Sequence, residues 1–575
     1  MRTLPCLLCL AILGASFACG SGSGGPADSA PAPDFSLSAG APPAIQAGNS
    51  VTTVVSAART NGHRAAISLG LEGNPQGITG SGGIALDALS GSLAITVPSG
   101  VAAGGYTLTV AGNDGSLPSR KAVLAVAVTA PPPPAGSTES AFGIYGSHGL
   151  HPKFQQATGL GDAALFKWSD GHMETLQAHW TRFSLLAAWS LVEPVLGGGY
   201  NWKVQTPNGA PDTILGAVYA PGNDIHAVLN IQALSLEKGL PSRSPFTHPA
   251  EYAAFLKTLA ARYGGGTGSI QVNHFQLGNE MQDWFDRGLT AEQYGEAARI
   301  TLEALRSVNP KAQLVMLGGF ERGTILEDRY KQAIKALKSQ GVKPLAIDIH
   351  WWFWPTGGCP WQSSAIPDAR KFLDSQGFQD VQIWSMENGG WVGCPSGQPV
   401  QTEQDQARLL VKRFVWGRAN GLDKLFWQQL LDLYNFDGKP DSFFNSAGLV
   451  DDGEQNCSDP ARRNTERIAY WSYRKLALET DNLVASPAGA LAGIHDGTLV
   501  FAYDYLRKDG SHRYILWREN GIGNISLPVP GSSWRATNLV PDRFGVFQET
   551  LFAPKEGHLS IQVGPDPVLL SPAAP

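Results

Sequence analysis

A repeated alternation of buried strands and amphipathic helices occupies the middle of the chain, between residues 141 and 482. Eight apolar runs have the length and composition of buried strands. In chain order they are AFGIYG, WTRFSLLA, DIHAVLNIQ, NHFQLGNE, AQLVMLGG, LAIDIHWW, VQIWSMEN and DKLFWQQL. Eight parallel strands with helical crossovers predict a (β/α)8 TIM barrel. A doubly wound sheet is the rival, but no strand leads into a glycine-rich phosphate loop.

Two segments that flank the barrel have the pattern of small β-sandwiches. Residues 34–130 contain short alternating runs such as SVTTVVSA and GSLAITV, separated by Gly, Asn and Pro. This segment resembles the immunoglobulin-like modules of bacterial exported proteins; we interpret it as a spacer, with a carbohydrate-binding module as the alternative. Residues 131–140 form a stiff proline-rich linker, and residues 483–575 predict a C-terminal sandwich that serves packing. The predicted fold class is therefore multidomain.

The N-terminus reads MRTLPCLLCLAILGASFACGSGSGG, one arginine before an apolar run that ends in small residues. This pattern predicts a secretory signal over residues 1–18. The stretch SFAC followed by GSGSGG resembles a bacterial lipobox, which implies acylation of Cys19 and a flexible tether over residues 19–33. Plain secretion is the alternative. We expect an exported bacterial protein, held at the cell envelope by the lipid or released.

Cysteine content and net charge restrict the remaining classes of function. Cys359 and Cys394 are expected to form a disulfide, with Cys457 free or as the competing partner. No cysteine has metal-finger spacing, and we expect no metal and no cofactor. The net charge of -6 and the absence of a basic run argue against a nucleic-acid partner. We expect a monomer whose only membrane contact is the lipid anchor.

Two glutamates follow predicted strands in the same way. Glu280 ends HFQLGNE, the fourth strand, and Glu387 ends VQIWSMEN, the seventh. Active sites of such barrels lie at the carboxyl ends of the strands, and strands four and seven face each other across the mouth. Two carboxylates there suit the cleavage of a glycosidic bond. The amide of Asn279 is placed to hydrogen-bond the sugar hydroxyl beside the reacting carbon.

These motifs resemble the retaining glycoside hydrolases of clan A, barrels with both catalytic glutamates at these two strand ends. The resemblance covers about residues 141–480, although the fuller WNEP-type signature is absent after strand four. It implies that Arg182, in TRFS, holds the nucleophile. It also implies that His350, ending AIDIH, belongs to the site and that Trp427, in LFWQQ, floors the first sugar subsite.

The two glutamates are expected to differ in charge. Glu387 is predicted to be the ionised nucleophile, stabilised by the Arg182 guanidinium. Glu280 is predicted to be the acid/base, which first gives a proton to the leaving oxygen and then accepts one from water. We expect a poly- or oligosaccharide substrate. The alternative is a sugar-binding surface lipoprotein that has the barrel but no activity.

Further aromatic and polar residues near the strand ends are weaker candidates. Trp391 is expected to stack on a sugar ring, and His226, Asn230 and His148 are candidate subsite residues. Other acids are interpreted as structural or peripheral: Glu193, Asp283, Glu321, Asp348 and Asp432. An esterase is disfavoured because the barrel has no G-x-S-x-G elbow. A metal enzyme is disfavoured because HGLH, residues 148–151, has no helical partner set with Glu.

Overall fold

The structure is a computed structural model of the whole chain, which divides by internal contacts into two units, Met1–Thr129 and Ala130–Pro575. It describes residues 31–573 except 41, 43–44, 47–49, 74–76, 99–100, 102–103, 130–139, 150–154, 156–157, 207, 237–238, 240, 265–269, 321–326, 353–361, 394, 396–397, 433–441, 455–461, 484, 487–490, 492 and 508–509. The expected disulfide between Cys359 and Cys394 and the expected lipidation site, Cys19, lie outside these residues.

The first unit is an eight-stranded sheet whose pairs are antiparallel except for β2 with β8. Its strands are β1(Asp34–Ala39), β2(Ile45–Gln46), β3(Ser50–Thr60), β4(Ile67–Glu72), β5(Thr79–Ile84), β6(Ser90–Thr96), β7(Gly104–Asn113) and β8(Arg120–Thr129). The spatial order is β1-β3-β6-β5-β4-β7-β8-β2. Along β3, Val55 and Ala57 are buried while their neighbours are exposed, because successive side chains of a strand point to opposite faces. These inward residues build a separate apolar core.

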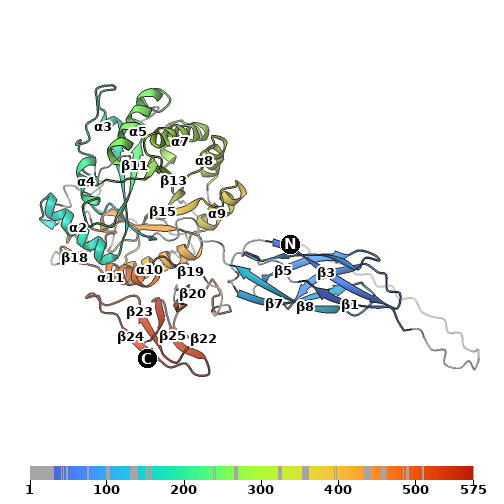
Figure 1. Cartoon of the computed structure of the whole chain (residues 1–575). Helices are drawn as coiled ribbons and strands as arrows, with labels where there is room; N and C mark the ends of the chain where they lie inside the picture. Colours follow the sequence, from blue (N-terminus) through green and yellow to red (C-terminus); the bar gives the residue numbers. More distant parts are fainter. Residues whose placement is uncertain are drawn as a thin grey trace, which may run out of the picture. The chain divides into compact units, whose positions relative to one another are not determined.

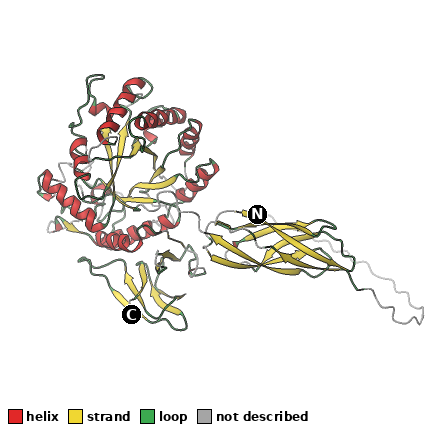
Figure 2. Ribbon diagram, viewed as in Figure 1, coloured by secondary structure: helices red, strands yellow, loops and turns green. Residues whose placement is uncertain are grey.

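The second unit contains a closed barrel of eight parallel strands (Figures 1 and 2). They are β9(Phe142–Tyr145), β10(Trp180–Ala188), β11(His226–Gln232), β12(His274–Leu277), β13(Gln313–Phe320), β14(Ala346–His350), β15(Gln382–Asn388) and β16(Lys424–Trp427). Each contains the core of one apolar run predicted from the sequence, so the predicted barrel is confirmed. Closure comes from β9, which pairs with both β10 and β16.

Helices surround the barrel, as Figure 2 shows. They are α2(Asp162–Leu176), α3(Trp189–Val192), α4(Pro211–Val218), α5(Pro249–Tyr263), α6(Gln282–Asp286), α7(Ala291–Arg306), α8(Asp328–Ser339), α9(Ala365–Ser375), α10(Glu403–Ala419) and α11(Ile468–Thr480). Capping boxes fix the starts of α7 and α10, where Thr290 pairs with Gln293 and Thr402 with Asp405. No helix of the described chain is both long and apolar enough to cross a membrane.

The C-terminal segment forms antiparallel sheets that pack on the barrel's helices. The larger sheet has the order β19(Ala485–Ser486), β20(Val500–Leu506), β21(His512–Arg518), β26(Val568–Pro572), β23(Trp534–Asn538) and β24(Glu549–Phe552), and β22(Gly523–Pro528) pairs with β25(His558–Val563). Its residues Trp517 and Leu539 belong to the same buried cluster as the barrel. Lys412 of α10 also ion-pairs with Glu519 at 2.7 Å. Part of the C-terminal segment therefore joins the barrel's core, while residues such as Leu516 and Trp534 build a separate apolar cluster.

Candidate active site

Arg182 and Glu387 form a buried ion pair at the carboxyl end of the barrel. Arg182 lies on β10 with none of its surface exposed, and its Nη1 donates to Glu387 Oε1. Glu387 is the penultimate residue of β15 and is 8% exposed. Burying a lone guanidinium would be costly, so the carboxylate is needed to offset the lost hydration. The guanidinium also keeps positive charge beside this acid.

Asn279 and Glu280 follow β12 in a turn that packs on β13. The Asn279 side-chain oxygen accepts a hydrogen bond from Nη2 of Arg182. A side chain at Gly318 would place its Cβ 1.7 Å from the Asn279 carbonyl oxygen, so this position of β13 requires glycine. Gly318 thus lets the backbone carrying the Asn-Glu pair lie directly on the neighbouring strand.

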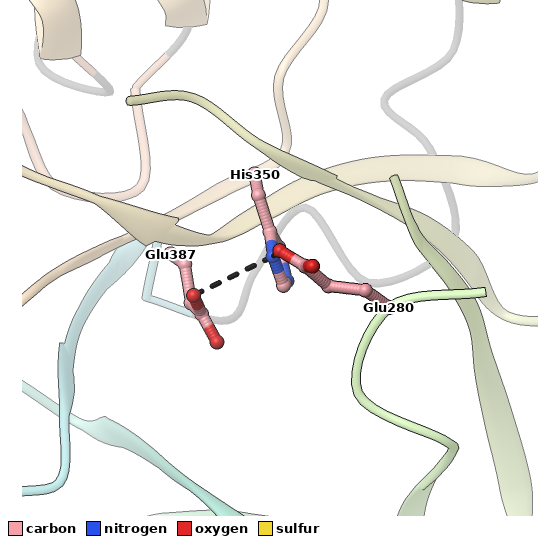
Figure 3. A group of neighbouring side chains, drawn as sticks. All are labelled: Glu280, His350 and Glu387. Carbon is pink, nitrogen blue, oxygen red and sulfur yellow. Dashed lines mark hydrogen bonds and ion pairs between the residues drawn. The ribbon is translucent and has the colours of Figure 1, made fainter. Parts of the chain in front are cut away.

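His350, the last residue of β14, contacts both acids. Its Nδ1 lies 2.9 Å from Glu280 Oε1 and 3.4 Å from Glu387 Oε2. Figure 3 shows the two glutamates extending toward each other, with the imidazole meeting them. One carboxylate oxygen of each glutamate and one ring nitrogen of His350 lie within 4.8 Å of one another. The structure therefore brings the side chains of Glu280 and Glu387 together, although 107 positions separate them.

A second layer of polar side chains lies beneath this cluster, and its contacts with the site were not predicted from the sequence. Asp348 of β14 is fully buried and its Oδ2 accepts from Nε2 of His350 at 3.0 Å and from Nε2 of Gln276 at 2.9 Å. The Gln276 oxygen accepts from Nε of Arg182 at 2.7 Å. The available signal was an acid and an amide within otherwise apolar strands, since such groups are buried only when hydrogen-bonded.

The electrostatic environment favours the cationic forms of His350 and Arg182. Burial opposes protonation of His350, but the charges of Glu387 and Asp348 outweigh it and raise its pKa to about 10. Burial likewise opposes the charge of Arg182, yet Glu387 raises its pKa above the ordinary value. Tyr145 of β9, whose ring lies 5.3 Å below the guanidinium, has its pKa raised to about 12 by burial and by Glu387. Tyr145 is therefore neutral at ordinary pH.

Asn230 lies beside the cluster but is occupied by the protein. It is fully buried, and its side-chain oxygen accepts from the backbone N–H of Leu185 at 3.0 Å. Leu185 has a positive φ of 56° where the register of β10 shifts. The amide nitrogen of Asn230 donates to Gly278 and Gln276. The expected contact with sugar is therefore replaced by support of the two strands that carry the site.

Of four other residues expected at the sugar site, one lies at the opposite end of the barrel and three are buried against protein groups. His226 is the first residue of β11, at the amino end of the barrel, where its ring packs 5.0 Å from Trp180. Trp427 is fully buried and donates to the Ala447 carbonyl, so its ring offers no open platform. Trp391 is 2% exposed and donates to the carbonyl of Pro399.

His148 is buried too and lies 2.8 Å from Asp170. Two of the acids interpreted from the sequence as structural or peripheral have contacts that explain their burial. Glu193 accepts from the indole of Trp189 at 2.7 Å. Asp432 ion-pairs with Arg467, and burial raises its pKa well above the ordinary value. Glu321 lies outside the described residues.

Two groups of described residues have oxygen or nitrogen atoms close enough to hold a metal ion. One is the cluster of Glu280, His350 and Glu387, and the other is a set of three buried aspartates, Asp432, Asp451 and Asp452. In the first, Arg182 already ion-pairs with a carboxylate. In the second, Arg467 does so. A guanidinium thus supplies the compensating positive charge in each group.

Comparison with known proteins gives a fold and no family. No protein-family model and no curated protein matches the sequence. Among solved structures, a glucosidase from Croceicoccus marinus matches with a TM-score of 0.52 and 13% identity, over 76% of this chain and 97% of that one. A Bacteroides ovatus GH5 xyloglucanase, solved with a XXXG heptasaccharide, matches at 11% identity with a TM-score of 0.34, over 77% of this chain and 100% of its own. The first match shows a fold shared with a glucosidase.

Proposed function

We propose that the protein is a retaining glycoside hydrolase that cleaves O-glycosidic bonds of a poly- or oligosaccharide. The observation that carries the proposal is the acid pair at strand ends four and seven, with one oxygen of Glu280 within 4.8 Å of one oxygen of Glu387. Retaining enzymes hold their carboxyl groups about 5–5.5 Å apart, whereas inverting enzymes need about 6.5–9.5 Å to admit a water. The short separation favours the retaining class.

The different surroundings of the two acids support different roles. Glu387, paired with Arg182, is the carboxylate that attacks the anomeric carbon and forms a glycosyl ester as the bond to the leaving oxygen breaks. Glu280 gives its proton to that oxygen. In the second step Glu280 takes a proton from water, the resulting hydroxyl bonds to the anomeric carbon, and the ester bond to Glu387 breaks. Two displacements at one carbon restore its configuration.

Asn279 is suited to hold the hydroxyl next to the reacting carbon. Its oxygen is engaged by Arg182, so its amide nitrogen is the group that donates to the sugar. A contact of this kind strengthens as positive charge develops on the sugar ring in the transition state. The side-chain orientation that Arg182 imposes would thus contribute to turnover.

The chain is also proposed to act outside the cytoplasm, held by a lipid on Cys19 with the N-terminal unit as a spacer. The support is the sequence pattern at the N-terminus. Metabolic labelling with a fatty-acid probe tests it. Loss of label and release of the protein in Cys19→Ala are expected; a wild-type chain that takes up no label would contradict the anchor.

Activity is tested on a panel of aryl glycosides and polysaccharides with the full chain and with Glu387→Ala and Glu280→Ala. Each substitution is expected to lower turnover by about 10³-fold or more. Azide should restore turnover of activated glycosides in Glu387→Ala, because the vacated space admits a small nucleophile. NMR of the first-formed anomer should show retention. Asp283→Asn, an exposed acid three residues after Glu280, is the matched control and should keep full activity.

A wild-type protein that hydrolyses nothing on the panel but binds one of its sugars would instead establish the non-catalytic alternative. Inverted product would reject the double displacement while keeping the hydrolase. Near-normal turnover by either alanine variant would reject the assignment of that glutamate.

A further inference from the structure

Asp348 occupies the centre of the hydrogen-bond network beneath the two acids. It lies on β14 with none of its surface exposed. Besides the two donors to its Oδ2, its Oδ1 accepts from the backbone N–H of Met386 on β15 at 2.8 Å. Donors from β12, β14 and β15 thus converge on one carboxylate. Both oxygens are engaged by protein groups, so Asp348 can act on substrate only through its neighbours.

Two chains of contacts run from Asp348 to the acids. The first passes through His350, whose other ring nitrogen faces Glu280 and Glu387. The second passes through Gln276, which donates to Asp348 and accepts from Arg182. One buried carboxylate therefore sets the orientation of both cationic side chains that contact the acid pair. A network in which every member is satisfied holds a site in a single geometry.

We propose that Asp348 is a positioning residue that fixes the orientation of the His350 ring. Nε2–H of the ring then donates to Asp348, Nδ1 faces the two glutamates, and Glu280 and His350 share the proton used in acid catalysis. The proposal rests on the proposed function, because it assigns that proton's path. In one state the ring is cationic and Nδ1–H donates to Glu280. In the other the proton is on Glu280, whose O–H donates to Nδ1. The proton moves along the Nδ1–Oε1 hydrogen bond between these two states.

The charge of Asp348 influences how tightly that proton is held. The ionisable groups that face the ring are Glu280 after β12, Glu387 on β15 and Asp348 on β14, while Arg182 on β10 is the nearby cation and Tyr145 on β9 is neutral. A nearby negative charge stabilises a protonated imidazole. Neutralising Asp348 should therefore release the shared proton at lower pH, and the reaction needs that proton to protonate the leaving oxygen.

Kinetics of Asp348→Asn against pH test this. We expect kcat to fall at least about tenfold and the alkaline limb of the kcat/KM profile to move down by about one pH unit. Asp423→Asn is the matched control. Asp423 is half-buried and also accepts from a backbone N–H, that of Ile383 at 2.9 Å. It precedes β16 at the opposite end of the barrel, so its removal should leave the limb unmoved. A fall in kcat without movement of the limb would overturn the proposal.

NMR of the imidazole nitrogens gives a readout that needs no turnover. His350→Gln identifies the His350 signals by their disappearance. In the wild-type enzyme the ring should carry two protons at neutral pH and, once titrated, keep the remaining one on Nε2. In Asp348→Asn the same titration should occur at lower pH.

A neutral ring protonated on Nδ1, or an unchanged titration in the variant, would overturn the inference. If Asp348→Asn does not fold, the wild-type tautomer alone decides. If the wild-type protein hydrolyses nothing, the proposed function fails, while the NMR result still tests the role of Asp348.

Discussion

The two ends of the barrel use the same strands for opposite purposes. At the amino end, Lys424 lies over the rings of Trp180 and Trp384, with its Nζ 4.2 and 5.4 Å from the ring centroids. At the carboxyl end, Arg182 lies two residues along β10 from Trp180 and pairs with a carboxylate. Side chains two residues apart point to the same face of a strand, so one strand supplies an aromatic layer and then a charged one. The charged layer places acids directly against cations, as in the Arg182–Glu387 and His350–Asp348 pairs.

The histidines of the two ends show the same contrast. Burial, helped by His226 and Lys424, lowers the pKa of His274 to about 3, so this ring is neutral among the aromatic side chains. At the other end the pKa of His350 is raised to about 10 because two carboxylates outweigh burial. Burial lowers the pKa of both rings, so it is the neighbouring carboxylates that decide the charge of His350, whereas His274 stays neutral.

The largest expected difference between the two ends is in catalysis. Glu387→Gln keeps the size of the side chain but removes the nucleophilic charge, so kcat/KM on an activated glycoside should fall by about 10⁴-fold or more. His226→Gln changes the amino end and should leave kcat/KM within about twofold. Asn230 is the residue of β11 that lies beside the site, and His226 is four residues before it, or about 13 Å along the strand at 3.3 Å per residue. A comparable loss in both variants would break the division between the ends.

The next effect is on stability at the carboxyl end. Arg182→Ala removes the buried guanidinium that donates to Glu387 and Asn279, and should lower the free energy of unfolding by about 3–5 kcal/mol. Arg182→Lys should recover part of the stability but little activity, because an ammonium cannot reproduce three directed contacts. Urea denaturation and kinetics on the same samples measure both. Full activity in the lysine variant would contradict the need for the planar guanidinium.

A smaller effect is expected for the cation of the amino end. Lys424→Met removes the contacts with the two indole rings and the hydrogen bond to the Ser140 carbonyl. These contacts are offset by the cost of burying an ammonium, so the free energy of unfolding should change by less than about 2 kcal/mol. Calorimetry gives the stability, and kcat/KM should not change. An activity loss would show coupling between the ends.

The smallest effects are pH dependences of opposite sign. The folded-state pKa of His274 lies below its ordinary 6.5, so its contribution is present above pH 6.5 and is lost as pH falls toward 3. The folded-state pKa of His350 lies above 6.5, so its contribution is complete below pH 6.5 and is lost as pH rises toward 10. The pH dependence of the melting temperature should differ from wild type below pH 6.5 in His274→Gln. In His350→Gln it should differ above pH 6.5. Matching profiles would refute the assigned charges.

Residue patterns predicted the barrel and the acid pair because both depend on local features. Each barrel strand is a continuous apolar run, and its burial on both faces leaves few other structures available. Glu280 lies four residues after Gln276, and residues separated by an even number of positions face the same side of a strand. Its inward direction could therefore be expected from the sequence. Gln276 and Asp348 were equally visible as polar residues in apolar strands, but their partners lie on other strands, and a single strand does not identify them.

Alternation fails for one predicted site residue, Glu387, and holds for another, Trp427. On β15, Trp384 and Met386 point into the barrel, so simple alternation would turn Glu387 outward. A register shift between Ser385 and Asn388 lets Glu387 reach Arg182. On β16, Phe426 points inward, and Trp427 joins the outer core instead. That is why the expected sugar platform is buried.

Local sequence is enough to show which segments become strands and which two strand ends carry glutamates, since strand formation follows from the hydrophobicity and shape of neighbouring residues. It takes the folded barrel to bring Arg182 to an acid 205 positions away and to place His350 against carboxylates from other strands. The folded barrel also joins Asp348 to these groups. Such contacts depend on barrel closure and on register between strands, and both are set by the packing of the whole domain rather than by any single segment.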